Sequence, residues 1–347
     1  MKSVVVSSMI EEIEEEGMRH MKAVVHELGE LKVGTMAEPI AGVGEVVVAI
    51  RAAGLNRRDI YIPGRRGDVA EALILGSDGA GVIVALGEGV THFALGDEVI
   101  INPALRWFEN SVAPPKQFDI LGMPDHGTFA EKIVISVEQI ERKPAHLSWE
   151  EAAVLSLSAL TGYRALFTKG NLQAGETVFI PGAGSGVATF LIAFAKNSGA
   201  RVIVTSRSEE KRQQALALGA DVALDTASDW VTELADETID LVIDSVGRAT
   251  FNRSLDVLKQ GGRIVVFGAT TEDTVDLNLR AFFYGQYQLF GSTMGSREEL
   301  REMLAHIETY NMRPVVDKVY KLNDALAAFN YVEESKQFGK VALRISE

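Results

Sequence analysis

The sequence predicts an α/β protein of two domains, in which a β-rich domain precedes a doubly wound parallel sheet. The chain has 347 residues, more than one compact core usually holds, so about two domains are expected. Residues 21–150 carry short β-like runs between Gly-rich turns, and no long helix interrupts the early ones. From about residue 150 strand and helix patterns alternate, which is typical of a doubly wound sheet.

The β-rich domain is predicted from a series of short segments, several of which alternate apolar and polar residues. In chain order these segments are MKAVVHE, GEVVVAIRAAG, DGAGVIVALG, GDEVIIN and GTFAEKIVI. Alternation of this kind indicates strands with one buried face. Together the segments predict a barrel or a sandwich.

The second domain is predicted to open with a pair of helices and to continue as alternating strands and helices. In SWEEAAVLSLSALTGYRAL, Ser148 is the expected N-cap and Glu151 follows three residues later, as in a capping box. The strand segments that follow are ETVFI, RVIVTS, DVALD, IDLVIDS and GRIVVFG, with a helical segment between each strand and the next. The closing residues predict an amphipathic helix and a last strand, GKVALRI.

Residues 1–20 are predicted to form an acidic, mobile extension, because IEEIEEEG carries a run of charge before the first strand. The alternative is that translation begins at Met18 or Met21. Codons for Glu-Glu-Gly are purine-rich, like a bacterial ribosome-binding sequence, which favours this alternative.

The composition excludes several classes of function. Lys and Arg number 34 against 48 Asp and Glu, a net charge of −14, which argues against a nucleic acid partner. The chain has no Cys, so disulfides, thiolate zinc sites and cysteine nucleophiles are impossible, and its six His show no pair at metal-ligand spacing. With no apolar run of about 18 residues and no secretory segment, we expect a cytoplasmic protein without a membrane partner.

A Gly-rich turn between a strand and a helix predicts a dinucleotide-phosphate site. The glycines allow a ligand to approach the backbone, and the N-terminus of the helix presents free N–H groups to a pyrophosphate. The literal G-x-G-x-x-G is absent, because Thr189 or Val187 stands where the last Gly is required. The alternative is a turn that serves only the path of the chain. The candidate residues are Gly182, Ala183, Gly184, Ser185, Gly186 and Val187.

The end of the second strand favours NADP(H) over NAD(H). An NAD-binding domain usually carries Asp or Glu there, whereas this strand ends in Ser206 and Arg207, with Lys211 one helical turn later. Hydroxyl, guanidinium and ammonium donors suit a 2′-phosphate. The alternative is that Arg207 and Lys211 are solvated residues at a helix start. Further strand ends that face the same crevice add Ser245, Val246, Gly268 and Ala269 as candidate cofactor residues.

The order of these domains and their motifs resembles the medium-chain dehydrogenase/reductase superfamily from about Met21 onward. The motifs are AAGLNRRDIY, LGSDGAGVIVALGEGV, GDEVIINP, HGTFAEKIVI, LTGYRAL, the GSGV turn and GKVALRI. The resemblance implies a GroES-like catalytic domain over residues 21–152, to which residues 303–347 return. It also implies a Rossmann NAD(P)-binding domain over residues 153–302, and a homodimer or homotetramer.

The same resemblance argues against a metal. Zinc alcohol dehydrogenases of this superfamily carry Cys where this chain has Asn56, and His-Glu where it has Ser77 and Asp78. Zinc takes about three protein ligands, and Asp78 alone does not supply them. Residues 102–129 correspond to a lobe that holds four Cys in those enzymes. Here we expect packing by Trp107, Phe108 and Phe118 instead.

In the zinc-lacking quinone oxidoreductase-like branch, which the chain resembles most, the motif N-x-x-D-x-Y occurs at this place. Asn56, Asp59 and Tyr61 match it and are the candidate catalytic residues. The bland alternatives are a turn-capping amide, a helix-start carboxylate and an aromatic at the barrel edge. The resemblance adds a last set of candidate cofactor residues: Thr161, Gly291, Ser292, Thr293 and Lys340.

Without zinc, acceptors that spread negative charge are the easiest to reduce. We therefore expect an NADPH-dependent oxidoreductase that reduces a small quinone or α,β-unsaturated carbonyl compound by hydride transfer. Hydrogen-bond donors such as the Tyr61 hydroxyl and the Asn56 amide would face the developing anion. The alternatives are a zinc-independent alcohol dehydrogenase or aldehyde reductase, and a cofactor-binding protein with little turnover.

Overall fold

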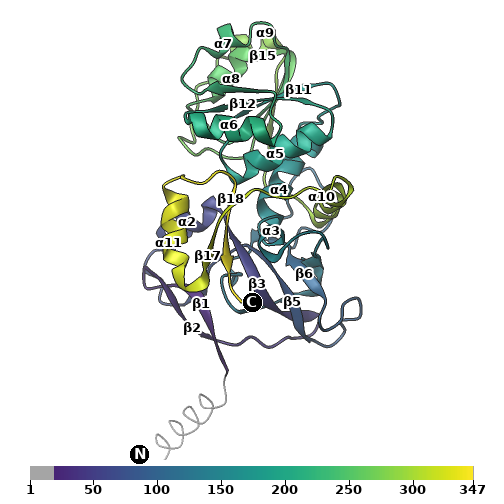
Figure 1. Cartoon of the computed structure of the whole chain (residues 1–347), viewed down its shortest axis with the longest axis vertical. Helices are drawn as coiled ribbons and strands as arrows, with labels where there is room; N and C mark the ends of the chain where they lie inside the picture. The colour runs from purple at the N-terminus through teal and green to yellow at the C-terminus, as the bar shows by residue number, and fades with distance from the viewer. Residues whose placement is uncertain (1–18, 347) are drawn as a thin grey trace, which may run out of the picture.

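The two predicted parts of the chain lie one above the other along the long axis of the molecule (Figure 1). The structure is a computed structural model that describes residues 19–346. The predicted extension lies outside the described residues except for Arg19 and His20, as does Met18. The first strand, β1, begins at His20. Within residues 19–346 no helix is both long and apolar enough to cross a membrane.

The β-rich part is organised around strand β3, which pairs antiparallel with β5, β9 and β18. Helices α3 (Trp149–Ala152) and α11 (Ala325–Glu333) also contact β3, which explains why most of its residues are buried. The seven-stranded sheet runs β10 (Ile140–Arg142), β6 (Glu98–Ile101), β5 (Asp78–Leu86), β3 (Glu45–Leu55), β18 (Lys340–Arg344) and β17 (Val316–Lys321), with β9 (Lys132–Ser136) also on β3. Smaller sheets join β2 (Glu30–Ala37), β1 (His20–Glu27) and β4 (Leu73–Ile74), and β7 (Ala104–Leu105) with β8 (Asp119–Ile120).

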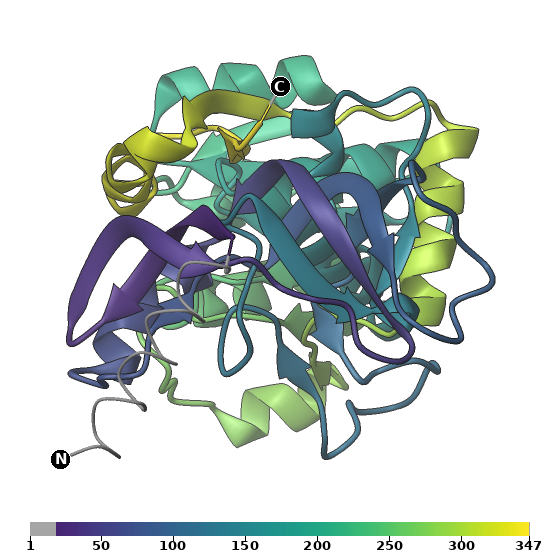
Figure 2. The same cartoon turned by 90° about the horizontal axis from the view of Figure 1, so that it is seen from below.

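Short helices complete this part, and the end of the chain returns to it. The last described strand, β18, lies in the first domain's sheet between β3 and the edge strand β17 (Figures 1 and 2). The domain boundaries at residues 152 and 302 stay a prediction. The helices are α2 (Arg57–Arg66), η1 (Val137–Gln139), η3 (Leu322–Asp324) and α11 (Ala325–Glu333).

The second part is a parallel sheet with helices on both faces, as predicted. In β11 (Thr177–Pro181), Val178 and Ile180 pack on the side of α5 (Gly186–Asn197). Phe179 faces Trp230 of α7 (Trp230–Glu233) on the other side, with ring centroids 5.1 Å apart. The sheet runs β13 (Val222–Asp225), β12 (Arg201–Ser206), β11 (Thr177–Pro181), β14 (Ile239–Asp244), β15 (Leu258–Val266) and β16 (Gln288–Gly291). The helices are α5 (Gly186–Asn197), α6 (Glu209–Leu218), α7 (Trp230–Glu233), α8 (Phe251–Val257) and α9 (Leu279–Gly285).

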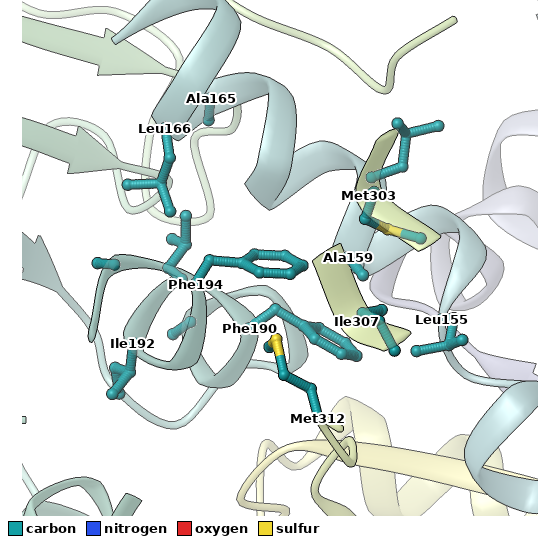
Figure 3. Packing of buried hydrophobic residues seen from close by; sticks show 14 of the residues in the cluster. Leu155, Ala159, Ala165, Leu166, Phe190, Ile192, Phe194, Met303, Ile307 and Met312 are labelled. Atoms are coloured by element: carbon teal, nitrogen blue, oxygen red, sulfur yellow. The ribbon is translucent and has the colours of Figure 1, made fainter. Parts of the chain in front are cut away.

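Helices α3 (Trp149–Ala152), α4 (Ser156–Tyr163) and α10 (Arg297–Thr309), with the π-helical turn η2 (Arg164–Lys169), join the two parts. Ser148 and Glu151 form the predicted capping box of α3. Figure 3 shows the core where Phe190 and Phe194 of α5 meet α4 and α10. The i, i+3, i+4 spacing of apolar residues predicts one buried face for α5, and this face is confirmed for Phe190, Leu191, Phe194 and Ala195. The fifth predicted residue, Val187, is only half-buried.

A buried ion pair fixes the lobe at residues 102–129. The Arg164 guanidinium lies 2.6 Å from Glu299, and it donates to the Ser111 carbonyl at 2.7 Å. Trp107 packs edge-on against Phe118, with centroids 5.3 Å apart, as the sequence analysis expected. The expectation for Phe108 was wrong, since 42% of this residue is exposed. The Arg164 guanidinium, rather than Phe108, packs over the Trp107 ring, 4.7 Å from the ring centroid.

The core at α5 generates a prediction for stability. Phe194 is fully buried, with the rings of Tyr163 and His306 at 5.8 and 5.3 Å. Phe194→Ala should therefore lower the free energy of unfolding by about 3–5 kcal/mol, because it leaves a cavity between helices. Urea unfolding followed by circular dichroism measures it. The exposed Leu326 gives the control Leu326→Ala, expected within about 0.5 kcal/mol of the wild type. A loss below about 1 kcal/mol in Phe194→Ala would contradict the prediction.

Candidate active site

The site forms where three strand ends meet in the central sheet. Strand β3 ends at Leu55, which lies opposite Val341 of β18, and Gly54 lies opposite Asp78 of β5. This register brings Asn56, Asp78 and Lys340 together, although 284 residues separate Asn56 from Lys340. Gly54 is required here, because a Cβ atom would lie 2.5 Å from the Ala153 carbonyl oxygen. The sheet therefore positions the candidate residues.

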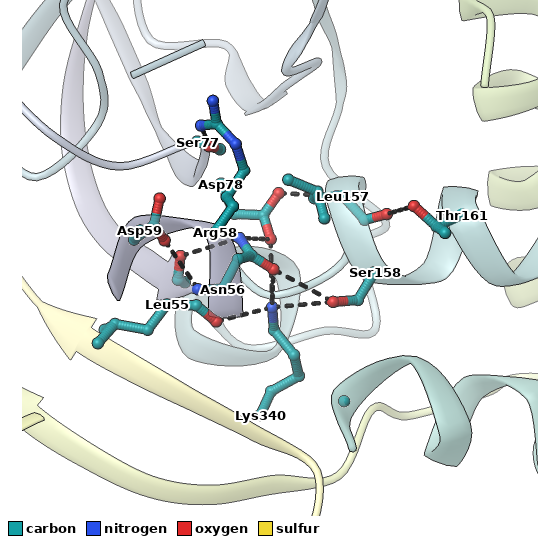
Figure 4. A network of polar contacts seen from close by, with 12 residues as sticks. Leu55, Asn56, Arg58, Asp59, Ser77, Asp78, Leu157, Ser158, Thr161 and Lys340 are labelled. Carbon is teal, nitrogen blue, oxygen red and sulfur yellow. Dashed lines mark hydrogen bonds and ion pairs between the residues drawn. The ribbon is translucent and has the colours of Figure 1, made fainter. Parts of the chain in front are cut away.

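The centre of the site is the buried ammonium group of Lys340 (Figure 4). Its Nζ donates to Asn56 Oδ1 at 2.5 Å, to the Leu55 carbonyl at 2.9 Å and to Ser158 Oγ at 3.1 Å. Asp78 Oδ2 lies 3.4 Å from Nζ. All three protons of the ammonium group thus have acceptors inside the protein. Only 3% of Lys340 is exposed.

Asp78 and Asn56 are held by the same network. Asp78 Oδ1 accepts from the Leu157 backbone N–H at 2.7 Å, and Oδ2 accepts from Asn56 Nδ2 at 3.0 Å. Asn56 Nδ2 also lies 3.4 Å from the Gly54 carbonyl, so both amide protons are donated within the protein. Burial raises the pKa of Asp78 and lowers that of Lys340, and the opposite charge of each partner counteracts both shifts.

Asp59 is buried and only partly satisfied. Its Oδ2 accepts from the Asn56 backbone N–H at 2.8 Å, which fixes the first turn of α2. Oδ1 has no hydrogen-bond partner among the described residues. Burial raises the pKa of Asp59 to about 6, against the attraction of the Arg58 guanidinium. The carboxyl group thus titrates close to neutral pH.

The positions that hold zinc ligands in metal-dependent members do not fit a zinc ion. Arg58 Nη1 donates to Ser77 Oγ at 2.7 Å and to the Leu121 carbonyl at 2.8 Å, and the Ser77 hydroxyl donates to the same carbonyl. The oxygens of Asn56 and Asp78 face the Lys340 ammonium. Residues 19–346 contain no group of three His, Cys, Asp or Glu that could hold a metal ion. Two side-chain cations occupy the surroundings that a metal would need.

Tyr61, the third predicted catalytic residue, lies apart from the buried network. It is on α2 one turn after Arg58, and 44% of it is exposed. The Arg57 guanidinium lies 6.0 Å from its ring centroid and donates to the Val332 carbonyl. Its catalytic role stays a prediction.

The predicted Gly-rich loop has the geometry of a phosphate cradle. It follows β11, with Gly182 at a φ of +85°, and Ser185 caps α5 by accepting from the Ala188 N–H at 3.1 Å. The N–H groups of Gly186 and Val187 precede the first intrahelical hydrogen bond, so they can bind an anion. A Cβ atom on Gly186 would lie 2.5 Å from Lys340 Cδ. The loop and the charged network are therefore in contact.

The other candidate cofactor residues follow the carboxyl ends of the parallel strands. Ser206 ends β12, and Arg207 after it is exposed. The ammonium group of Lys211 already has two acceptors within the protein, because its Nζ donates to the carbonyls of Ser335 and Gln337 at 2.8 Å. Thr161 Oγ1 donates to the Leu157 carbonyl at 2.7 Å. The ends of β14, β15 and β16 bring Ser245, Val246, Gly268, Ala269, Gly291, Ser292 and Thr293 to the same edge of the sheet.

Sequence reasoning did not single out Ser158 or the fixed position of Arg58. Ser158 lies one helical turn before Thr161 on α4, so the i, i+3 spacing was the available signal. Arg58 is one of four arginines on α2, with Arg57, Arg65 and Arg66, and the sequence does not distinguish among them. Its contacts with Ser77 and Leu121 depend on tertiary packing, which no local pattern reveals.

Comparison with known proteins gives consistent matches over both parts. A family model for the alcohol dehydrogenase GroES-like domain matches residues 42–145, and one for zinc-binding dehydrogenase matches residues 186–309. The zinc-type alcohol dehydrogenase-like protein YogA of Leptosphaeria maculans is 32% identical, covering 91% of this chain and 94% of its own. The acryloyl-coenzyme A reductase of Metallosphaera sedula is 30% identical, covering 93% and 99%.

Two solved structures share the whole arrangement. An NAD-dependent alcohol dehydrogenase has a TM-score of 0.87 at 35% identity, covering 94% of this chain and 100% of its own. The 2-octenoyl-CoA carboxylase reductase CinF, solved with NADP and 2-octenoyl-CoA, has a TM-score of 0.85 at 26% identity, covering 94% and 87%. The fold and the site define an oxidoreductase that uses a nicotinamide cofactor. The chain belongs to the medium-chain dehydrogenase/reductase superfamily, as its motifs predicted.

The buried carboxyl group of Asp59 generates a pH-dependent prediction. Its pKa of about 6 in the folded state exceeds the ordinary 3.8. Unfolding therefore releases a proton between these values, and Asp59 lowers stability progressively as the pH rises through them. Asp59→Asn should be more stable than the wild type by on the order of 2 kcal/mol at about pH 8, and by nothing at about pH 3.5.

Urea unfolding at both pH values checks this, with Asp273→Asn at an exposed position as the control. A variant Asp59→Asn that is less stable than the wild type at about pH 8 would show that Arg58 compensates fully for the burial.

Proposed function

We propose that the protein is a zinc-independent, NADPH-dependent reductase of α,β-unsaturated carbonyl compounds or quinones. The observation that carries this proposal is the pair of cations, Lys340 and Arg58, bonded to the side chains at the zinc-ligand positions. A metal could assemble there only if these ion pairs and hydrogen bonds were broken. In place of a metal ion, the side chains of Lys340 and Arg58 then supply the positive charge at this site.

Fixed side-chain cations suit an acceptor that spreads its negative charge. When bound, NADPH supplies a hydride to an electrophilic carbon. An aldehyde then concentrates the charge on one alkoxide oxygen, where a metal helps most. An enone or a quinone delocalises the charge as an enolate or a phenolate, which hydrogen-bond donors and side-chain charges can stabilise. The chemistry of the site therefore favours the delocalising acceptors.

Different groups of the protein bind the cofactor, position the site and supply the proton. The backbone N–H groups at the start of α5 hold the pyrophosphate, and the stem of Lys340 lies against the same turn at Gly186. Lys340 and Asp78 hold Asn56 in place. Because the Asn56 amide protons are donated within the protein, the hydrogen bond to the substrate comes from other groups, and the final proton comes from Tyr61 or from water. Asp59 positions the first turn of α2.

The relatives support the same class of substrate. The acryloyl-coenzyme A reductase and the CinF enzyme are named for, or solved with, α,β-unsaturated thioesters. The similarity to a solved alcohol dehydrogenase makes an aldehyde or an alcohol the second candidate substrate. We propose NADP(H) rather than NAD(H) because β12 ends without an acidic residue and exposed Arg207 follows it.

We further propose that the protein forms a homodimer, or a homotetramer built from dimers. Strand β16 is an edge strand of the parallel sheet, so its outer backbone groups have no strand partner among residues 19–346. Four exposed apolar side chains on β16 and α9 accompany this edge: Leu279, Phe283, Tyr284 and Leu289. Pairing between two such edges would cover this surface.

Turnover with a panel of acceptors tests the reductase proposal. NADPH oxidation should be fastest with enones, enoyl thioesters or quinones, and a chelator should leave the rate unchanged. Tyr61→Phe should lower kcat by about tenfold or more, because it removes one donor near the developing anion. A loss under about threefold would remove Tyr61 from the mechanism. Turnover of aldehydes alone would favour the second candidate, and tight NADPH binding without turnover would favour a binding protein.

Cofactor preference gives a separate prediction. Wild-type protein should bind NADPH more tightly than NADH. Arg207→Ala should weaken NADPH binding by about tenfold, because it removes one charged hydrogen bond to the 2′-phosphate. NADH binding should stay within about twofold. Isothermal titration of both nucleotides measures this, with exposed Arg280→Ala as the control. Tighter binding of NADH by the wild type would reverse the assignment.

A further inference from the structure

We propose that the Arg58 guanidinium directly stabilises the negative charge that forms on the substrate oxygen, at the place where zinc-dependent members of the superfamily hold their metal. This inference rests on the proposed reductase function and names the cation that serves it. Arg58 was not among the residues that the sequence motif assigned to the site. The case depends on comparing the two cations near Asn56.

Lys340 has no donor left for a substrate. Its three ammonium protons have acceptors in Asn56, Ser158 and the Leu55 carbonyl, with Asp78 alongside, and it is buried. A substrate oxygen would have to displace one of these bonds inside a closed network. Lys340 is therefore a positioning residue, and its charge is balanced by Asp78.

Arg58, in contrast, has N–H groups that make no hydrogen bond among the described residues. A guanidinium carries five N–H groups. Two bonds run from Nη1, to Ser77 Oγ at 2.7 Å and to the Leu121 carbonyl at 2.8 Å, and Nη2 makes a long contact of 3.4 Å with the Ile120 carbonyl. Nε and the second Nη2 proton have no partner among residues 19–346. The residue is only partly buried, and Nε is not one of the buried polar atoms that lack a partner, so this donor is open to a ligand.

The position of Arg58 also suits the reaction. It lies three residues before Tyr61 on α2, so the two side chains are neighbours on one helix face. On its other side it holds Ser77, one of the zinc-ligand positions. An oxygen between Arg58 and Tyr61 would receive a charged and a neutral hydrogen bond together.

The electron balance is that of a conjugate reduction. A hydride forms the new C–H bond at the β-carbon, and the π electrons of the C=C bond move so that the carbonyl oxygen becomes an enolate. Arg58 donates to that oxygen throughout and stays protonated. A proton from Tyr61 or water then adds to the α-carbon. The substrate is reduced by two electrons, and the nicotinamide is oxidised by the same two.

The kinetic test compares Arg58→Met with Arg66→Met. Arg66 is on the same helix and donates to the His26 and Glu71 carbonyls, so it is a matched structural arginine. Arg58→Met should keep its fold, because the Ser77 hydroxyl still bonds to the Leu121 carbonyl. We expect kcat to fall by about 100-fold with the dissociation constant of NADPH unchanged, and guanidinium chloride to restore part of the rate. A loss under about threefold, or an equal loss in Arg66→Met, would overturn the inference.

A binding test works without turnover. The probe is 4-nitrophenol, whose phenolate resembles the enolate, titrated in the NADP⁺ complex by its absorbance. Wild-type protein should lower the pKa of the bound phenol by about one unit or more, and Arg58→Met should abolish this shift. Equal pKa values in both proteins would overturn the inference. If the shift appears while no unsaturated acceptor turns over, the reductase proposal fails and the role of Arg58 as an anion-stabilising cation stands.

Discussion

The architecture of the site depends on one buried charge, the ammonium group of Lys340. It enters from the last strand, is held by acceptors on β3 and α4, and lies against the first turn of α5 through its methylene chain. Four elements therefore converge on one side chain. Because an unpaired buried ammonium is costly, each of these elements must take its place for the network to be satisfied. The GroES-like sheet and the Gly-rich loop are thereby fixed relative to each other.

The charges around Lys340 are balanced in number, but the two carboxylates among them differ in their hydrogen bonding. Lys340 and Arg58 are opposed by Asp78 and Asp59, so the cluster is close to neutral. Asp78 accepts three hydrogen bonds or ion-pair contacts, whereas one oxygen of Asp59 has none among the described residues. A fully satisfied network of this kind is rigid and specific. Asp78 is thus fully paired, whereas Asp59 keeps one oxygen without a partner among the described residues and has a raised pKa.

The sequence alone predicted most of what depends on local pattern. The alternation of strands and helices, the capping box at Ser148, the helix at Gly186 and the buried face of α5 all follow from spacing, and the structure has them. The contacts that define the site join residues from opposite ends of the chain, such as Asn56 and Lys340, and only the family resemblance placed Lys340 near the crevice. Lys211 shows the same limit. Its sequence position suited a phosphate, but tertiary packing gives its ammonium group two backbone acceptors.

The absence of a side chain at Gly186 has a consequence for engineering the protein. The space that a Cβ atom would need at this turn is filled by the stem of Lys340. A grafted loop with a larger residue at that position would displace the Lys340 ammonium from its acceptors. Asp78 would then lose its opposite charge and keep only neutral partners such as Asn56. Redesign of this turn would thus have to be carried out jointly with redesign of Lys340 and Asp78, as one coupled unit.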